Sequence, residues 1–195
     1  DGICGTGNYC IQCNPKFSYN STACVAMPVC KSGKTLFDDV DKLLDVNTYL
    51  GNSSEGDWTY TGYVLDYDNS TLLAMPKNSG GTVISSTFYV WYGKVTTRFK
   101  SSHLGGVVSS SILYSNVQDE IDFEFIGSNL TYPQTNYYYE GMLDYTNMVP
   151  LESSDTFENW HTYEVDWTED YVKWSIDGGV SRTLNKNDTY NATDD

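Results

Sequence analysis

The sequence lacks any long apolar run and holds few cations. No stretch of its 195 residues approaches the roughly 18–20 consecutive apolar residues that a membrane-spanning helix needs. Its 11 Lys and Arg residues are outnumbered by 26 Asp and Glu residues, and they form no cluster. With a formal net charge of −15, the chain is not expected to bind nucleic-acid phosphates through bulk charge. A neutral partner or an extracellular setting fits this composition better.

Histidine is also scarce. The two histidines, His103 and His161, stand apart in the sequence, and neither has the Ser or Cys neighbourhood of a nucleophile triad. Two lone histidines do not make a metal site. We therefore expect no metal and no cofactor.

Cysteine is absent after residue 30. The five cysteines crowd the first thirty residues, at Cys4, Cys10, Cys13, Cys24 and Cys30. This density predicts a disulfide framework formed in an oxidising compartment, although the Cys10-x-x-Cys13 spacing leaves a zinc site open. The odd count suggests that one partner lies outside the chain.

Sequence signals for the secretory route are frequent. Six N-x-S/T sequons predict N-glycosylation and secretion, at Asn20, Asn52, Asn69, Asn129, Asn187 and Asn191. The chain has neither an initiator Met nor a signal peptide, so we expect a processed or excised piece of a protein.

Strand patterns fill the chain from Trp58 onward, with turn residues between them. The predicted strands are 58–66, 71–76, 82–90, 93–100, 106–114, 119–126, 134–140, 160–167 and 170–176. A short helical turn is expected within 38–50. Trp160, Trp167 and Trp174 are interpreted as core residues. Many short strands without a long helix predict an all-β sandwich or jelly roll.

One predicted strand alternates acidic and apolar residues without interruption. Its period places Glu120, Asp122 and Glu124 on one face and three apolar side chains on the other. Like charges so close together repel, and catalysis is one reason for such an arrangement. The alternative is the charged outer face of an edge strand, which resists aggregation.

The spacing of the two glutamates suits glycoside hydrolysis, which needs two carboxyl groups beside the bond to be cut. Their Cα atoms lie about 13 Å apart on a flat strand, at roughly 3.3 Å per residue. Inward-leaning side chains and strand curvature would bring the carboxyls near the ~5–5.5 Å of a retaining site, short of the ~6.5–9.5 Å of an inverting one. The aromatic tract 132–145 that follows is of the kind that stacks on sugar rings.

The segment Asp119–Gly127 resembles the signature strand of glycoside hydrolase family 16. The flanking segments narrow the resemblance to the Crh branch, the fungal cell-wall transglycosylases that join chitin to β-glucan. These segments are Phe88–Val95, Gly106–Ser110, Gln134–Tyr137 and Trp160–Trp167. The likeness runs from about Cys24 to Arg182. One departure is Glu140, where the family usually carries a Lys before the Gly, and it could alter substrate preference.

The resemblance implies a concanavalin-like β-jelly roll with a sugar-binding cleft. It also assigns Glu120 as the nucleophile, Asp122 as the assisting residue and Glu124 as the general acid/base. Gln134, Asn136 and Tyr138 would line the cleft. The implied reaction cuts chitin (β-1,4-linked N-acetylglucosamine) and transfers it to β-glucan in cell-wall cross-linking. A plain hydrolase of chitin or β-glucan and a non-catalytic carbohydrate-binding wall protein remain as alternatives.

The resemblance also bears on domains and location. Residues 1–30 resemble the tail of a hevein-like chitin-binding module, and residues 31–195 would form the catalytic domain. The family continues beyond the last residues with further strands, so we expect truncation at both ends. We expect an extracellular protein of the cell wall or cell surface with a polysaccharide substrate, a monomeric state, and a lipid anchor in the full-length protein.

Overall fold

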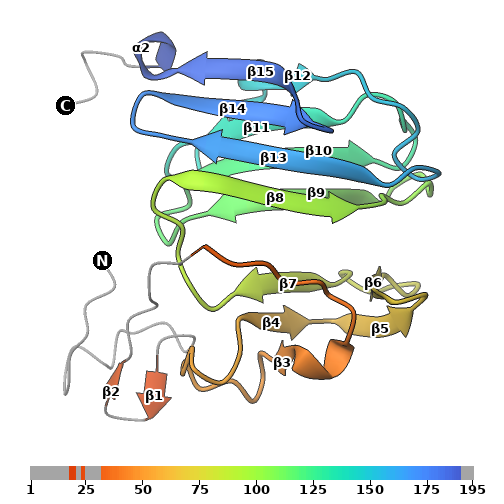
Figure 1. The fold of residues 1–195 in the computed structure, drawn as a ribbon, viewed down its shortest axis with the longest axis vertical. Helices are drawn as coiled ribbons and strands as arrows, with labels where there is room; N and C mark the ends of the chain where they lie inside the picture. Colours follow the sequence, from red (N-terminus) through yellow and green to blue (C-terminus); the bar gives the residue numbers. More distant parts are fainter. Residues whose placement is uncertain (1–17, 21–22, 25–31, 190–195) are drawn as a thin grey trace. The chain divides into compact units, whose positions relative to one another are not determined.

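The computed structural model describes residues 18–20, 23–24 and 32–189, and nearly all of its regular structure is β-strand (Figure 1). The chain divides into two compact units, with the boundary between Trp91 and Tyr92. No helix in the described part of the chain is long and apolar enough to cross a membrane. The predicted all-β class is confirmed.

The described residues of the first unit form three small sheets. A two-stranded sheet pairs β1 (Ser18–Asn20) with β2 (Ala23–Cys24), and a hairpin pairs β5 (Tyr63–Tyr67) with β6 (Ser70–Ala74). A three-stranded sheet has the order β3 (Leu44–Asp45), β4 (Trp58–Thr61) and β7 (Val83–Ser86). The short helical turn expected within 38–50 is the 3-10 helix η2 (Val40–Lys42).

The strand predicted at 58–66 is two strands, because the chain turns at Gly62. This glycine has φ +99, and a Cβ there would lie 2.4 Å from the carbonyl oxygen of Gly81. An L side chain at this position would therefore meet both backbone strain and a steric clash.

The second unit is a sandwich of two antiparallel four-stranded sheets (Figure 1). One sheet has the order β12 (Val149–Pro150), β11 (Gln134–Tyr138), β10 (Glu120–Ile126) and β9 (Val108–Tyr114). The other has the order β15 (Gly179–Asn185), β14 (Tyr171–Ile176), β13 (His161–Trp167) and β8 (Gly93–Phe99). The 3-10 helix η3 (Tyr145–Asn147) precedes β12, and the helix α2 (Lys186–Thr189) follows β15.

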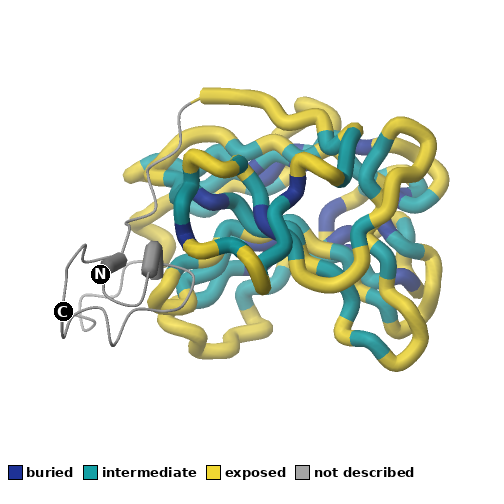
Figure 2. Tube along the Cα trace, turned by 90° about the horizontal axis from the view of Figure 1, so that it is seen from below, coloured by how far each residue is buried: buried dark blue, intermediate teal, exposed yellow. Residues whose placement is uncertain are grey.

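The core of the sandwich is aromatic. Phe123 and Phe125 of β10 meet Tyr163 of β13, with the rings of Phe125 and Tyr163 4.5 Å apart. Trp174 of β14 completes this cluster and has no exposed surface. Figure 2 shows buried positions as short stretches, while most loops are exposed. Because the core holds the apolar side of β10, the acidic side of the strand must face away from it.

The three tryptophans expected in the core have different environments. Trp174 is buried and Trp167 packs partly against the core. The prediction for Trp160 is wrong, because its side chain is 44% exposed and lies under the guanidinium of Arg98, 4.7 Å from the ring centroid. The inner face of β13 begins at His161, so the preceding residue points outward.

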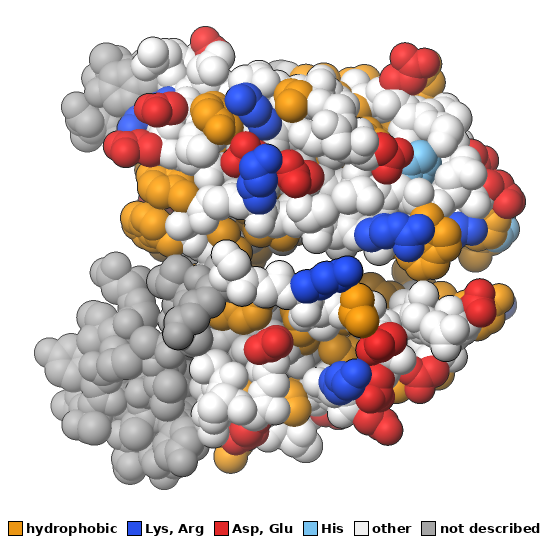
Figure 3. Space-filling view, viewed as in Figure 1, with side chains coloured by type: hydrophobic (Ala, Val, Ile, Leu, Met, Phe, Trp, Pro, Cys, Tyr) orange, Lys and Arg blue, Asp and Glu red, His pale blue; other side chains and the backbone are white. Residues whose placement is uncertain are grey.

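The outer face of the β15–β14–β13–β8 sheet carries charges of both signs (Figure 3). Lys94 lies 3.2 Å from Glu164 and 3.6 Å from Asp166. Exposed pairs of this kind contribute little to stability. They also place a cation beside the acids of this face, so these acids do not form an unpaired row.

Candidate active site

Strand β10 places the three predicted acids on one face. Phe123 and Phe125 anchor its other face in the core. Glu120 and Glu124 are half-buried, whereas Asp122 is 0% exposed. Strand β10 pairs with β9 on one side and β11 on the other, so it is a central strand. Protection of a sheet edge therefore does not explain its charges.

The register of β11 brings the three predicted cleft residues beside the acids. Gln134 pairs with Glu124 and Tyr138 pairs with Glu120. Directly paired residues of neighbouring strands share a face, so these side chains lie next to the carboxyls. The structure thus assembles on one sheet face all six residues that sequence reasoning selected for catalysis and substrate binding.

Asn136 pairs with Asp122 and is nearly inaccessible. Its side-chain amide donates to the carbonyl oxygen of Asp144 at 3.2 Å, and its side-chain oxygen accepts the N–H of Tyr137 at 2.9 Å. These bonds tie the residue to the protein itself. Asn136 thereby joins β11 to the loop that follows it, beside the acids.

Sequence reasoning missed an apolar margin supplied by β9. Ile112 lies opposite Asp122 and Tyr114 lies opposite Glu120, on the same face as the acids. Both are exposed, Tyr114 by 58%. The available signal for this margin was the period of two along the strand, which puts Ile112 and Tyr114 on the same face.

A second margin of the acidic row, which is aromatic, comes from the loop after β11. Tyr145 opens the 3-10 helix η3, is 68% exposed, and makes an edge contact with Tyr138 at 6.4 Å between ring centroids. Asp144 caps this helix by accepting the N–H of Thr146 at 2.9 Å. Tyrosines therefore flank the acidic row on both sides, as a surface that stacks on sugar rings requires.

Burial sets the charge state of Asp122. The pKa of Asp122 is raised to about 7, chiefly by removal from water. The charges of Glu124 and Glu120 also raise it, whereas the N–H of Asn136 and the charge of Arg182 lower it. Its Oδ1 accepts the N–H of Asn136 at 2.7 Å, while its buried Oδ2 has no hydrogen-bond partner. Below about pH 7 this carboxyl is protonated, and Oδ2 is the oxygen free to hold the proton.

The environment of Glu120 also changes its pKa. Burial raises the pKa of Glu120, and the charge of Glu124 adds to the rise. Asp122 and Glu120 therefore keep their protons to higher pH than free carboxyls do. Such a row can present an ionised carboxylate and a protonated carboxyl at the same time, which is what a retaining glycosidase needs.

Comparison with known proteins places this geometry in a family. The family model described as glycosyl hydrolases family 16 matches residues 52–194, which include all three acids. The chain belongs to glycosyl hydrolase family 16.

Within this family the chain is similar to two curated fungal proteins. It is 59% identical to Congo red hypersensitive protein 2 of Saccharomyces cerevisiae and 55% identical to Crh-like protein UTR2 of Candida albicans, each over 98% of this chain. In both cases the match covers 42% of the relative, so the chain spans less than half the length of these proteins.

A solved structure supports the same placement. The Crh5 transglycosylase in complex with NAG is 30% identical to this chain, with a TM-score of 0.71. The match covers 91% of this chain and 68% of the solved one. The fold expected from the resemblance, the family 16 jelly roll, is therefore shown.

Elsewhere in this family 16 chain, His161 has partners that its sequence context did not indicate. Its Nδ1 lies 2.6 Å from Oδ2 of Asp177, and its Nε2 lies 3.1 Å from Oγ of Ser154. The order matches a hydrolytic triad, so the expectation that His161 lacks a serine partner is wrong. Ser154 also accepts from Asn159, and Asp177 also accepts the N–H of Thr162. We assign these bonds to holding the 153–159 loop against β13.

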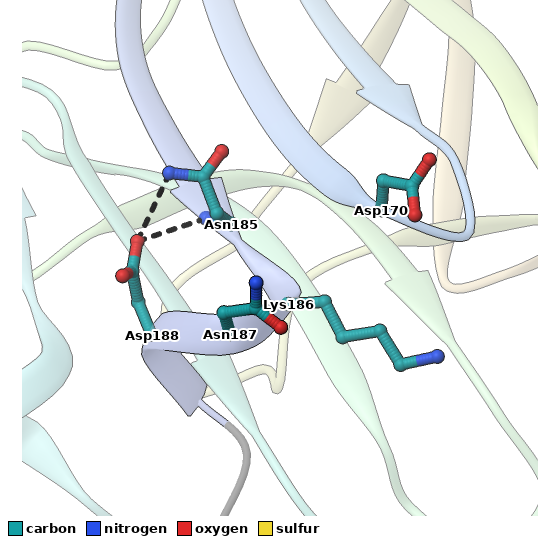
Figure 4. Close-up of a pocket in the computed structure, with 5 residues that line it drawn as sticks. All are labelled: Asp170, Asn185, Lys186, Asn187 and Asp188. Carbon is teal, nitrogen blue, oxygen red and sulfur yellow. Dashed lines mark hydrogen bonds between the residues drawn. The ribbon is translucent and has the colours of Figure 1, made fainter.

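A polar hollow lies at the end of β15 (Figure 4), lined by Asp170, Asn185, Lys186, Asn187 and Asp188. Asp188 accepts from the side-chain amide of Asn185 at 3.0 Å. The hollow has no aromatic lining and belongs to the sheet that does not contain β10. No group of three metal-binding side chains occurs in the parts of the chain that the structure describes.

The structure describes the side chains of four of the six predicted glycosylation sites. Asn69, Asn129 and Asn187 are exposed and Asn52 is half-buried. The side chain of Asn20 and all of Asn191 lie outside the described residues, as do the cysteines apart from the backbone of Cys24.

Proposed function

We propose that this protein is a retaining transglycosylase that cuts chitin and transfers it to β-glucan in the cell wall. The observation that carries the proposal is the row of Glu120, Asp122 and Glu124 on one face of a central strand, between aromatic margins. Membership of family 16 supports the same chemistry.

In the first step the carboxylate of Glu120 attacks the anomeric carbon at the bond to be cut. The carbon–oxygen bond breaks, and Glu124 gives its proton to the leaving oxygen. In the second step the carboxylate of Glu124 takes the proton of an acceptor hydroxyl, whose oxygen attacks the anomeric carbon and releases Glu120. Two displacements at one carbon retain its configuration.

Asp122 assists both steps. A proton on its Oδ2 can be shared with a neighbouring glutamate, which stabilises that glutamate as a carboxylate. The pKa of about 7 keeps this proton in place in weakly acidic surroundings.

The substrate assignment rests on the relatives. The solved relative is called a transglycosylase and binds NAG, the N-acetylglucosamine unit of which chitin is built. Tyr114, Tyr138 and Tyr145 offer rings on which such sugars could stack. An extracellular, cell-wall location, a monomeric state and a lipid anchor on the full-length protein remain predictions, of which the exposed sequons support the first.

Incubation of the protein with a chitin oligosaccharide and a labelled β-glucan acceptor tests the proposal. We expect longer labelled products, because transfer joins the cut donor to the label. Shortened donor without labelled product would favour a plain hydrolase. Binding without any product would favour a non-catalytic wall protein. The variant Glu164→Gln removes a carboxylate from the outer face of the other sheet, away from the acidic row, and should behave like the wild type.

A further inference from the structure

Arg182 is a cation placed behind the acidic strand. It lies on β15 with its side chain half-buried, and no salt bridge joins it to a carboxylate among the described residues. Removing a guanidinium from water without an anionic partner is costly. Its position therefore calls for compensating contacts and a reason.

The contacts of Arg182 join three parts of the second unit. One terminal nitrogen donates to the carbonyl and hydroxyl oxygens of Thr135 on β11, both at 2.8 Å. The other donates to the carbonyl oxygen of Asn147, also at 2.8 Å. The guanidinium carbon lies 4.4 Å from the ring centroid of Trp174 on β14. A planar fork suits such simultaneous contacts in different directions.

Two of these contacts lead directly to Asp122. The indole N–H of Trp174 donates to the backbone carbonyl oxygen of Asp122 at 2.9 Å. Thr135 precedes Asn136, whose N–H donates to Oδ1 of Asp122. Arg182 therefore touches Trp174, which holds the backbone of the middle acid, and Thr135, the chain neighbour of the residue that holds its side chain.

The third contact leads to the aromatic margin. Asn147 ends the 3-10 helix that Tyr145 opens, and Tyr145 makes its edge contact with Tyr138. By holding the last residue of this short helix, Arg182 sets how far Tyr145 stands from β11.

We infer that Arg182 is a positioning residue of the acid site: its fork holds β11, Trp174 and the Tyr145–Asn147 helix in one arrangement around Asp122. The inference rests on the proposed function. Its charge contributes as well, because Arg182 opposes the rise in the pKa of Asp122 that burial, Glu120 and Glu124 cause. Burial raises the pKa of Tyr138, and the charge of Asp122 adds to this rise.

Two substitutions separate the fork from the charge. Arg182→Lys keeps the charge but loses the fork, whereas Arg182→Met loses both and keeps similar length. Arg98→Met is the matched control, because Arg98 also stacks on a tryptophan but lies on the outer face. The readouts are turnover and KM per folded protein, the carbon NMR titration of the Asp122 carboxyl, and the proton NMR contact between Tyr138 and Tyr145.

Both Arg182 variants should lose about tenfold or more in turnover and weaken the tyrosine contact, while Arg98→Met stays within about twofold of the wild type. Arg182→Met should titrate Asp122 at higher pH than the wild type, and Arg182→Lys close to it. Turnover within about twofold in both Arg182 variants, with an unchanged Asp122 titration, would overturn the inference. If Arg182→Met does not fold, full turnover of Arg182→Lys is enough by itself to overturn the inference.

Failure of the inference differs from failure of the proposed function. Wild-type turnover tests the function by itself. The Asp122 titration and the tyrosine contact report on positioning even in a protein that only binds sugar.

Discussion

Asp122 has an environment very different from that of a free side chain. It has no exposed surface, one bonded oxygen and one unbonded oxygen, and two glutamates on the same face of its strand. Its pKa is raised from 3.8 to about 7, chiefly by burial. A group with this property stores a proton that the unfolded chain would release, so it links the charge of the site to stability.

Stability should therefore fall as pH rises between about 4 and 7. The contribution is complete below the unfolded pKa of 3.8 and is lost as the pH passes through the folded value of about 7. Its upper limit is about 4 kcal/mol, at about 1.4 kcal/mol per pKa unit. Asp122→Asn cannot ionise and should lose less stability over this range than the wild type. Urea unfolding at both ends of the range measures the difference, and an equal loss in both proteins would refute the account.

The sequence revealed the acidic row but not the residues that hold it. Strict alternation along seven residues placed the three carboxyls on one face, because strand geometry needs no distant information. Arg182 was not identifiable, since its partners Thr135 and Asn147 lie 47 and 35 residues away. Contacts at such separation depend on how strands pair, which local patterns do not encode.

At the scale of elements, the strands with apolar inner faces were predicted and β15 was not. Strand β15 (Gly179–Asn185) presents Ser181, Thr183 and other polar residues, and its inner face includes Arg182. Because β15 lacks an apolar alternation, no strand was predicted there from the sequence. The turn before β15 has Asp177 and Gly178 both at positive φ.

The end of β10 offers a test of how tightly its turn must pack. A Cβ on Gly127 would lie 2.1 Å from the carbonyl oxygen of Leu104, whereas a Cβ on Gly105 would meet nothing within 4 Å. Gly127→Ala should destabilise the protein by about 1–3 kcal/mol, because backbone atoms must move. Gly105→Ala is the matched control, because Gly105 follows Leu104 in the segment that Gly127 packs against, and it should leave thermal stability nearly unchanged. Equal melting temperatures for the two variants would contradict the packing.

At the scale of the whole molecule, the charge is compatible with the carbohydrate partner that we propose and unfavourable to a polyanion. The net charge of −15 repels phosphates, while neutral polysaccharides are indifferent to it. Within the second unit, the acidic row lies on one sheet and the mixed charges of Lys94, Glu164 and Asp166 lie on the other. In the proposed function the charge that matters is therefore local, and the margins beside it would supply the sugar contacts.

The central claim is that Glu120 and Glu124 act from one sheet face on the same sugar linkage. The most direct test gives Glu120→Ala and Glu124→Ala an activated β-linked chitin oligosaccharide with azide, and identifies the product anomer by proton NMR. With the nucleophile removed, azide should attack once and give the α-glycosyl azide. With the acid/base removed, azide should open the glycosyl-enzyme and give the β-glycosyl azide. Wild-type turnover without azide in either variant, or the same anomer from both, would contradict the account.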